Sequence, residues 1–314
     1  MSLRNTFKKQ GGYKLIKQYL KGGAFFTAIN QFIVLGKSRT ALEILRLSAE
    51  LKIKKKIEKQ YMSKLVEFDK TFIEQEHKYS NKVWVCWFQG FENSPQIVKT
   101  CLSSLRRNLP SKEIILITKN NLEQYVNFPK FIVEKWEKGL ITNTHMTDLL
   151  RLELLIRYGG TWIDATVLCT ENEKLIPDYF FNSDLFFFQT LKPGKDGQST
   201  YISSWYINAK SNNKILEATR FLCYEYWKKN DELVDYFLLH DFISIVLDYY
   251  SSDWKNIVPR DNSTPHNLLL RLFDPYDEQM FKFIVQQSPF HKLTYKFDSS
   301  SEELVNTNYK KIIE

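Results

Sequence analysis

The sequence predicts an α/β fold, in which a mostly parallel, Rossmann-type sheet is flanked by helices and preceded by a helical, basic N-terminal region. Continuous apolar runs such as residues 83–88 (VWVCWF) are typical of strands buried on both faces. Helical segments lie between these runs with short connections, which favours strand–helix–strand units. Residues 1–66 hold 15 Lys/Arg against 3 Asp/Glu, whereas the rest of the chain holds 29 against 33.

These observations divide the chain into a helical basic region (1–80), an α/β domain (81–300) and a C-terminal tail (301–314). The chain has 314 residues, a net charge of +8, 43% hydrophobic and 15% aromatic residues. That composition is typical of a folded globular protein and excludes a low-complexity chain. Apolar runs of about 18 residues are absent, so we expect no transmembrane helix. The longest candidate, 24–35, is too short and lacks the cleavage site of a signal peptide.

The N-terminal region is predicted to be helical up to residue 80. Tyr13, Ile16 and Leu20 form an apolar stripe among lysines, and Gly22-Gly23 is expected to divide the segment into two helices. A further helical run covers about residues 39–76. A basic amphipathic segment of this kind can lie on an anionic membrane, which is the interpretation we favour. The alternative is that the lysines form the solvated face of helices packed on the α/β domain.

The α/β domain is predicted to begin with the strand at 83–88, followed by a helix that starts at Ser94-Pro95 and ends near Asn108. A helix over 148–158 is expected to end at Gly159-Gly160. The other predicted strands are 113–118, 131–133 (a short one), 161–169, 184–189 and 205–209, and the other predicted helices are 213–230 and 233–250. Residues 192–200 are predicted to form a loop, and 281–297 short strands or irregular structure.

Several kinds of nucleotide and metal site are excluded. The first strand is followed by Gln89-Gly90-Phe91-Glu92, which fits neither the glycine pattern of dinucleotide-binding proteins nor a P-loop. A parallel sheet binds ligands at the carboxyl ends of its strands, so phosphates here would be held another way, most simply with a metal. The four cysteines, at positions 86, 101, 169 and 223, form no Cys-x-x-Cys pair, which indicates reduced core cysteines and not a zinc site.

Two carboxylates stand out. Asp148 and Arg151 are three residues apart, so a helix places them on one face, where they could form either a functional pair or an ordinary surface ion pair. Asp164 interrupts an otherwise apolar strand, and a charge there is costly unless it is paired or bound to a metal. It could present its carboxylate at the carboxyl end of the strand, or simply face solvent at the strand's end.

Taken together, these residues resemble a known family. Thr147-Asp148-Leu149-Leu150-Arg151, then Gly159-Gly160 and Asp164-Ala165-Thr166, look like the core of the capsular polysaccharide synthesis proteins. That family is related to glycosyltransferase family 32 and has a GT-A fold. The resemblance also takes in segments 84–90, 204–207 and 291–296, and covers about residues 80–297. It therefore implies a GT-A-like sheet and a nucleotide-sugar-dependent, retaining hexosyltransferase.

The resemblance implies roles for individual residues. Asp148 and Arg151 would hold the donor sugar hydroxyls, and Asp164 would reach the metal or the ribose. Trp87 could stack on a uracil ring, or simply pack in the core. His291 would be a metal ligand, or only a surface histidine, and Lys292 would touch the diphosphate. The other positions implied at the donor site are Gln89, Gly90, Gly160 and, as a substitute for Lys292, Lys296.

The implied cofactor is a divalent metal, Mn²⁺ or Mg²⁺. Thr166 stands where the family pattern has a second aspartate, and a hydroxyl is a weaker ligand for a hard cation than a carboxylate. The metal could therefore be loosely held, or partly replaced by basic side chains. His240 and Asp241, in the helical stretch 233–250, are further catalytic candidates, with Asp241 orienting the acceptor or stabilising the developing cation. The alternative is that Asp241 lies on a solvated helix face.

The sequence thus predicts a cytoplasmic glycosyltransferase that uses a nucleotide-sugar donor, most simply UDP-linked. Its acceptor would be a lipid-linked saccharide, reached by peripheral association of residues 1–66 with the inner face of the plasma membrane. A catalytically inactive GT-A-fold scaffold for capsule assembly is one alternative. A nucleic-acid-binding protein is another, but the positive charge does not extend into the α/β domain, and we expect no nucleic-acid partner.

Overall fold

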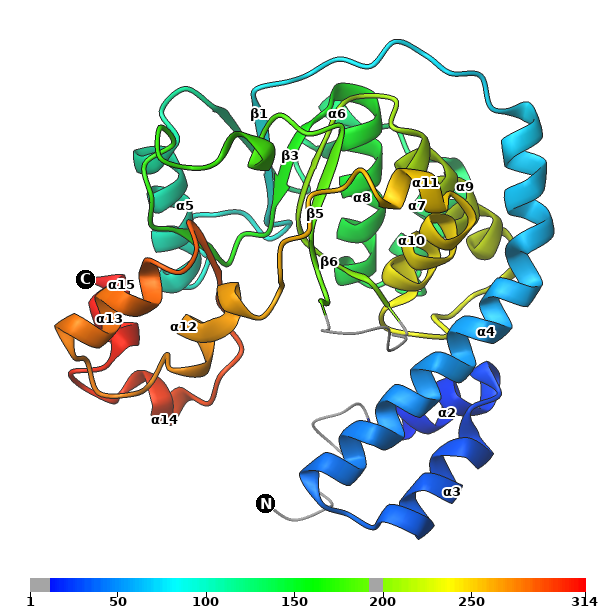
Figure 1. The fold of residues 1–314 in the computed structure, drawn as a ribbon, viewed down its shortest axis with the longest axis horizontal. Helices are drawn as coiled ribbons and strands as arrows, with labels where there is room; N and C mark the ends of the chain where they lie inside the picture. The colour runs from blue at the N-terminus through cyan, green and yellow to red at the C-terminus, as the bar shows by residue number, and fades with distance from the viewer. Residues whose placement is uncertain (1–11, 192–199) are drawn as a thin grey trace.

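The computed structural model describes residues 12–191 and 200–314, and within them an α/β body from which N-terminal helices project (Figure 1). The central sheet has five strands in the order β2-β1-β3-β6-β5. Parallel pairing joins β1 to β2 and to β3, whereas β6 is antiparallel to both β3 and β5. Four of the five strands therefore run in one direction. The strands are β1 (Lys82–Cys86), β2 (Glu113–Ile117), β3 (Gly160–Ile163), β5 (Leu185–Gln189) and β6 (Ile202–Ala209).

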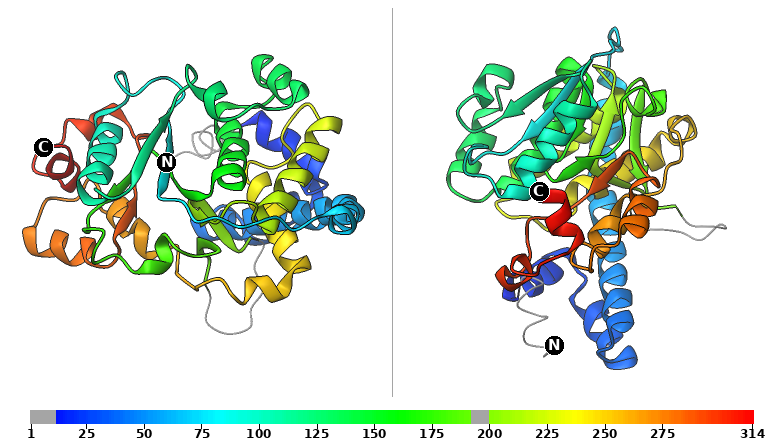
Figure 2. Two further views of the ribbon diagram at one scale, coloured as in Figure 1. Left: turned by 90° about the horizontal axis from the view of Figure 1, so that it is seen from above. Right: turned by 90° about the vertical axis from the view of Figure 1, so that its left-hand side faces the viewer.

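Side chains of the central strands alternate between two apolar cores. In β1, Trp84 and Cys86 enter one core, while Val83 and Val85 enter the other. The first core lies between the sheet and the long helices α8 (Asn143–Tyr158), α9 (Lys214–Lys229) and α10 (Leu238–Tyr249). The second lies under α5 (Gln96–Asn108) and the C-terminal elements. Helices cover both faces of the sheet (Figure 2), which confirms the prediction of doubly buried strands.

A second, two-stranded sheet pairs β4 (Val167–Cys169) with β7 (Phe290–Lys292) in antiparallel register, Val167 opposite Lys292. This pairing brings a segment near the C-terminus beside the end of β3. The other elements that follow β1 along the chain are short. They are α6 (Leu122–Tyr125), α7 (Lys130–Glu137), η1 (Asp178–Phe180), α11 (Ser251–Trp254), η2 (Thr264–His266), α12 (Asn267–Leu270), α13 (Glu278–Val285), α14 (Ser299–Glu302) and α15 (Asn308–Ile313).

The N-terminal region consists of α2 (Tyr13–Gly22), α3 (Phe25–Leu35) and the long α4 (Arg39–Thr71). The break predicted at Gly22-Gly23 is confirmed, because Gly23 ends α2 with a left-handed φ of 73°. The second half of α4 shares the first core with α9 and α10 through Ile57, Tyr61 and Leu65. Residues after α4 run as an extended segment to β1, where helix was predicted as far as residue 80.

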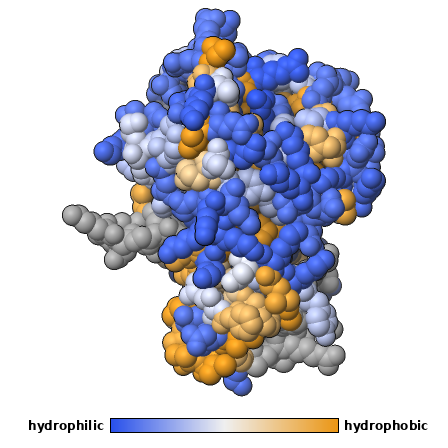
Figure 3. Space-filling view, turned by 90° about the vertical axis from the view of Figure 1, so that its right-hand side faces the viewer, coloured by the Kyte–Doolittle hydropathy of each residue, from blue (hydrophilic) through white to orange (hydrophobic). Residues whose placement is uncertain are grey.

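An apolar surface is exposed at the outer end of this region (Figure 3). Its most exposed residues on α3 are Phe26 (81%), Ile33 (74%) and Val34 (69%). They are joined by partly exposed side chains on α3 and α4, which are Ile29, Phe32, Leu35, Ile44, Leu47 and Leu51. We call these nine residues the apolar tip. Within residues 12–191 and 200–314, no helix is both long and apolar enough to cross a membrane.

Most of the predicted strands and helices are confirmed, and the exceptions have local causes. Residues 131–133 lie in helix α7 and not in a strand, because Pro129 starts a helix that buries Ile132. The strand predicted over 161–169 is divided into β3 and β4 by a turn in which the Val167 N–H donates to the Asp164 carbonyl (3.0 Å). The start of segment 281–297 belongs to helix α13, which Asp277 caps. Of the predicted loop 192–200, residues 192–199 lie outside the described residues.

The four cysteines are buried and unpaired, as predicted. Burial raises the pKa of the Cys101 and Cys169 thiols to about 12, which makes them unreactive core residues. The C-terminal tail also belongs to the body, because Tyr309 and Ile312 of α15 are buried in the second core. The packing thus extends from α4 to α15, beyond both ends of segment 81–300.

Candidate active site

Some of the predicted site residues meet where β3 ends, and these are Asp148, Arg151, Asp164 and Lys292. The N–H of Asp164 donates to the Trp205 carbonyl of β6 (2.9 Å), so this aspartate begins beside the central sheet and then turns away toward β4. Thr166 follows in the same turn. Because β1 and β3 are parallel neighbours, the segment after β1 reaches the same edge of the sheet. This is the edge at which α/β sheets bind ligands.

Helix α8 carries two of the site residues, Asp148 and Arg151. Thr142 caps the helix by accepting from the His145 N–H (3.2 Å). One turn further on, Asp148 Oδ1 lies 3.1 Å from Arg151 Nη2 and Asp148 Oδ2 lies 3.2 Å from His145 Nδ1. Arg151 Nη1 donates to the Ser204 carbonyl oxygen of β6 (2.6 Å), so both residues of the predicted pair are held in place. They are only 7% and 4% exposed, which distinguishes them from an ordinary surface ion pair.

Asp164 joins this pair to Lys292. Its Oδ1 accepts from Trp162 Nε1 (2.9 Å) and lies 3.6 Å from Arg151 Nη2, while its Oδ2 lies 2.9 Å from Lys292 Nζ. The same ammonium donates to Thr166 Oγ1 (2.7 Å). Burial would raise the pKa of Asp164, but Lys292 and Arg151 outweigh it and hold that pKa below its usual value. Asp148, Arg151, Asp164 and Lys292 therefore form one ion-paired group, which we call the charge cluster.

Of the two catalytic candidates on α10, His240 lies within range of the charges of this cluster and Asp241 does not. Burial lowers the pKa of His240 to about 4, and the charges of Asp148, Arg151 and Asp164 act on the same ring. Its Nδ1 is buried and accepts or donates no hydrogen bond within the described residues. The ring is therefore a neutral imidazole at neutral pH.

Asp241, one residue further along α10, projects from a different side of the helix and has different neighbours. Burial raises its pKa, Asp235 and Glu50 raise it further, and Lys54 of α4 opposes them. These neighbours belong to the contact between the body and the N-terminal helices. Consecutive helix residues project about 100° apart, which is why His240 and Asp241 cannot serve the same site. The expectation that Asp241 faces the reacting centre is thus not met, and neither is its alternative of a solvated face, since Asp241 is 2% exposed.

The turn after β1 carries the expected aromatic side chain. Trp87 is half-buried and its ring meets that of Tyr295 edge to face, with centroids 5.0 Å apart. Gly90 adopts a left-handed φ of 87° and its N–H donates to the Trp87 carbonyl (3.0 Å), which closes the turn. Gln89 is exposed beside it. Lys296 is exposed too, and its Nζ lies 5.6 Å from the centre of the Tyr295 ring and bonds to no cluster residue.

Two of the predicted site residues, His291 and Gly160, lie in positions that are explained by packing and not by ligand binding. His291 is fully buried, its Nε2 lies 3.2 Å from the Val285 carbonyl oxygen, and burial lowers its pKa to about 4. It sits next to Lys292 in β7, and alternate strand residues face opposite sides, so its ring points away from Asp164. Gly160 has a φ of 97°, and a Cβ there would clash with the carbonyl oxygen of Lys82. Its glycine identity is therefore explained by the close contact of β3 with β1.

The residues at the end of β3 do not form the donor set that a divalent cation requires. Mg²⁺ and Mn²⁺ take several oxygen ligands, chiefly carboxylates. Here both oxygens of Asp164 already accept from cations or from Trp162, both oxygens of Asp148 face Arg151 or His145, and Thr166 accepts from Lys292. No three of the described His, Cys, Asp and Glu residues gather as a metal site.

Sequence reasoning missed four residues that build this site. His145 could have been found, because it lies three residues before Asp148 on the same helix. Ser204, Trp162 and Tyr295 could not, because their roles depend on pairings between β3, β6 and the C-terminal segment. In the structure they hold Arg151, hold Asp164 and pack on Trp87, respectively.

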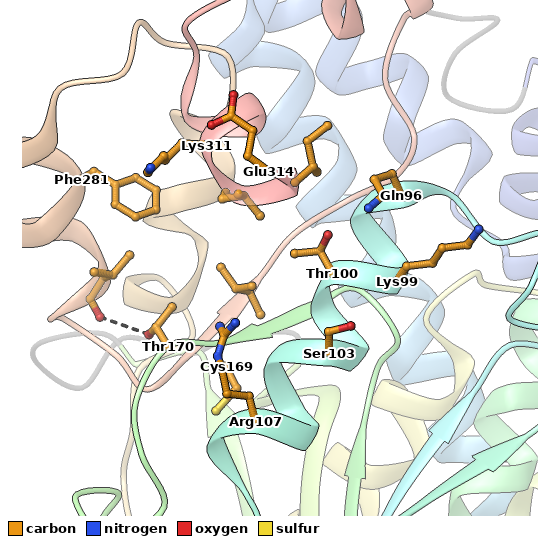
Figure 4. A pocket seen from close by; sticks show the side chains of 14 residues that line it. Gln96, Lys99, Thr100, Ser103, Arg107, Cys169, Thr170, Phe281, Lys311 and Glu314 are labelled. Atoms are coloured by element: carbon orange, nitrogen blue, oxygen red, sulfur yellow. Dashed lines mark hydrogen bonds between the residues drawn. The ribbon is translucent and has the colours of Figure 1, made fainter.

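Two cavities lie outside the charge cluster. The larger, about 970 Å³, is bounded by α2, α4, the start of α8 and the segment 231–237, and its lining includes Lys17, Lys21, Arg46 and Phe237. The smaller, about 510 Å³, lies between α5 and α15 and is lined by cations of both helices (Figure 4). None of the cluster residues lines the smaller cavity.

The fold and the site together define an α/β protein that presents buried, paired charges at the carboxyl edge of its sheet. Residues 37–312 match the model of the family described as "Capsular polysaccharide synthesis protein". The chain therefore belongs to the capsular polysaccharide synthesis protein family, as the sequence resemblance indicated. The matched range begins near the start of α4 and ends in α15, which agrees with the extent of the packed body.

Curated relatives carry glycosyltransferase names. The chain is 34% identical over 92 residues to O-glycosyltransferase braB of Annulohypoxylon truncatum, covering 26% of this chain and 22% of that protein. It is 25% identical over 146 residues to O-glycosyltransferase PaGT of Phomopsis amygdali, covering 41% of this chain and 34% of that protein. The chain thus spans about a fifth to a third of the length of these relatives. Among solved structures, PaToxG Glycosyltransferase aligns with a TM-score of 0.38 at 15% identity, over 83% of this chain and 96% of that one.

Proposed function

We propose that this protein is a glycosyltransferase that moves a sugar from a nucleotide-sugar donor to a saccharide acceptor in capsular polysaccharide synthesis. The observation that carries the proposal is the charge cluster at the carboxyl edge of β3, in a chain of this family. Transfer requires that a diphosphate leaving group be stabilised while positive charge develops on the sugar ring. The cluster offers a cation that can stabilise the diphosphate and carboxylates that can stabilise the positive charge on the sugar ring.

Each cluster residue has a distinct task in this proposal. Arg151 and Asp148, fixed by Ser204 and His145, hydrogen-bond the sugar hydroxyls. Lys292 contacts the diphosphate, and Asp164 orients that lysine. Trp87 and Tyr295 form an aromatic platform for the base, which we expect to be uracil. The neutral His240 lines the sugar side and contributes no charge at neutral pH.

We further propose that the transfer retains the anomeric configuration. Asp148 and Asp164 are both held in ion pairs, so neither is free to attack the sugar as a covalent nucleophile. Without a covalent intermediate, retention requires that the acceptor approach from the face from which the diphosphate departs, and it is the family resemblance that implies this outcome. An NMR assay of the anomeric configuration of the product, run on early time points, tests this: an inverted product would contradict it.

The acceptor in this proposal is a lipid-linked saccharide at the inner face of the plasma membrane. The apolar tip and the surplus of lysines in the N-terminal region support contact with an anionic lipid surface. The cavity of about 970 Å³ lies between these helices and segment 231–237, whose Tyr236 feels the charges of Asp148 and Asp164. An acceptor could therefore pass from the membrane-facing helices toward the cluster.

A donor panel tests the proposed function. The full chain is incubated with UDP-, GDP- and CMP-sugars, and release of the nucleotide diphosphate or monophosphate is measured with and without membrane extract as acceptor. We expect release from one donor class and at least a 100-fold loss of rate in Asp148→Asn. Glu153→Gln, on the same helix but paired with Arg220, is a matched control. Absence of release and of nucleotide binding with every donor would favour the inactive-scaffold alternative.

A further inference from the structure

We propose that the ammonium group of Lys292, and not a divalent cation, faces the donor diphosphate, so that donor binding and cleavage require no metal. This inference rests on the proposed function and identifies the group that performs one of its steps. Lys292 is the cation at the turn between β3 and β4, where Asp164 and Thr166 point. It comes from β7, 128 residues further along the chain than Asp164.

Among the residues that the structure describes, Lys292 Nζ has two hydrogen-bond partners, which leaves one donor available. An ammonium group has three N–H donors. One is directed at Asp164 Oδ2 (2.9 Å) and a second at Thr166 Oγ1 (2.7 Å), so a third can reach an oxygen outside the protein. The side chains of Lys292 and Asp164 are 21% and 25% exposed, which means that the pair reaches solvent at the edge of the sheet. A phosphate oxygen can therefore approach the ammonium directly.

The same contacts exclude a cation from this position. A metal bound to Asp164 would need to lie on Oδ1 or Oδ2, but Arg151 and Trp162 face the first and Lys292 the second. Two extra positive charges would then lie next to two existing cations, and in the described part of the chain the carboxylates paired with these cations are those of Asp148 and Asp164. Thr166 fits the lysine better than a metal, since a hydroxyl accepts readily from an ammonium but is a weak ligand for a hard cation.

Asp164 also explains why the ammonium is in place before the donor binds. Its carboxylate fixes the end of a long, flexible side chain, and the β4–β7 register holds the backbone of Lys292 opposite Val167. A cation fixed in advance loses little conformational freedom when it meets the leaving group. Asp164 is thus a positioning residue, and Lys292 is the residue that touches the diphosphate.

The experiment compares the wild-type full chain in two buffers. Titration calorimetry measures the binding of UDP, with GDP as the alternative probe, in EDTA and in Mn²⁺, and donor hydrolysis is measured in the same buffers. We expect dissociation constants and rates that agree within about threefold between the two buffers. Electron paramagnetic resonance of added Mn²⁺ is expected to show no protein-bound ion at concentrations where the chain is saturated with UDP.

Two variants and a matched control sharpen the test. Lys292→Met removes the ammonium and should weaken UDP binding about 10- to 100-fold, the value of one hydrogen bond to a charged group. Lys282→Met, an exposed lysine on the neighbouring α13, should bind as the wild type does. The double variant Thr166→Asp with Lys292→Ala supplies a second carboxylate and removes the ammonium, and should acquire Mn²⁺ binding and Mn²⁺-dependent UDP affinity.

The outcomes separate the inference from the proposed function. Loss of binding and hydrolysis in EDTA, with recovery in Mn²⁺, would overturn the inference while leaving the glycosyltransferase proposal in place. Unchanged UDP affinity in a folded Lys292→Met variant would also overturn it. If the wild type bound no nucleotide in either buffer, both proposals would be wrong. Because the buffer comparison uses the wild type alone, the inference is decided even if a variant does not fold.

Discussion

Two groups of partly or fully buried carboxylates in this molecule behave in opposite ways. In the charge cluster, Asp164 is paired with Lys292 and Arg151, and its pKa is held below the usual range. On the other side of α10 lies an acidic group of Glu50, Asp235 and Asp241, where burial raises the pKa of Glu50 to about 7 and that of Asp235 to about 6. The pKa of Asp241 is raised as well.

The difference lies in the cations that each group faces. The charge cluster has one guanidinium and one ammonium for two carboxylates, all within hydrogen-bonding or ion-pair distance. In the acidic group, Arg46 Nε lies 3.8 Å from Glu50 Oε1. The other nearby cation, Lys54, is already paired, because its Nζ lies 3.0 Å from Asp248 Oδ2. Burial is common to both groups, so it is the position of the partners that determines which carboxylates stay charged.

The largest expected effect comes from removing the cation that both carboxylates of the cluster share. Arg151→Leu leaves Asp148 and Asp164 without this partner in a buried setting, which costs about 3–5 kcal/mol of unfolding free energy. Urea unfolding at pH 7, followed by circular dichroism, measures it. Arg157→Leu, at the exposed end of the same helix, should cost less than about 1 kcal/mol. Equal losses in the two variants would contradict the view that the cluster depends on charge pairing.

This comparison also shows what the sequence could and could not predict. Strand and helix positions followed from apolar runs and caps, and the pairing of Asp148 with Arg151 followed from their spacing on α8. The position of Asp164 at the end of β3 followed from the cost of a charge within an apolar strand. By contrast, residues 131–133 are three aromatic or β-branched residues, a run too short to decide between helix and strand.

Contacts between distant segments could not be predicted. That Lys292 bonds to Asp164 depends on the pairing of β4 with β7, and the sequence gives no sign that the neighbouring His291 faces the interior. In the same way, only the rotation of α10 shows that His240 and Asp241 face different groups. A helical stretch of predicted length does not determine which of its residues faces which neighbour.

The second expected effect distinguishes the two groups by pH. Because the pKa of Glu50 lies above its unfolded value, the folded protein keeps a proton that the unfolded chain has released between about pH 4.5 and 7. The contribution of Glu50 to the free energy of unfolding is therefore complete below pH 4.5. As the pH rises to 7, the free energy of unfolding falls by about 2–3 kcal/mol. The lowered pKa of Asp164 has the opposite sign: its contribution is present above about pH 4 and is lost only at lower pH.

Glu50→Gln tests the sign directly. The free energy of unfolding of this variant should change less between pH 4.5 and 7 than that of the wild type, and its stability at pH 7 should be higher by about 1–2 kcal/mol. Glu43→Gln, exposed on the same helix, should keep the slope of the wild type. A slope that is unchanged in Glu50→Gln would mean that the acidic group does not titrate in this range.

A smaller effect is expected at the edge of the charge cluster, on binding and not on stability. Tyr295→Ala removes the ring that meets Trp87 and should weaken UDP binding by about 1 kcal/mol, or about fivefold, as for loss of one aromatic contact to a base. Fluorescence titration of the tryptophans measures it. Phe283→Ala, half-exposed on α13, is the control. If both variants bind UDP equally well, the aromatic pair does not form the base site.

The smallest effect on stability is expected at Val34, an exposed residue of the apolar tip that belongs to neither carboxylate group. Val34→Asp replaces a side chain that is 69% exposed, so the free energy of unfolding should stay within about 0.5 kcal/mol of the wild type. Sedimentation with anionic vesicles, however, should fall several-fold, because the new charge would have to enter the lipid interface. Val305→Asp, which is 81% exposed on the C-terminal side of the molecule, changes the net charge equally and should sediment as the wild type does. Equal sedimentation of all three proteins would leave the lysines as the only membrane contact, and loss of stability in Val34→Asp would mean that the tip packs against protein and not against lipid.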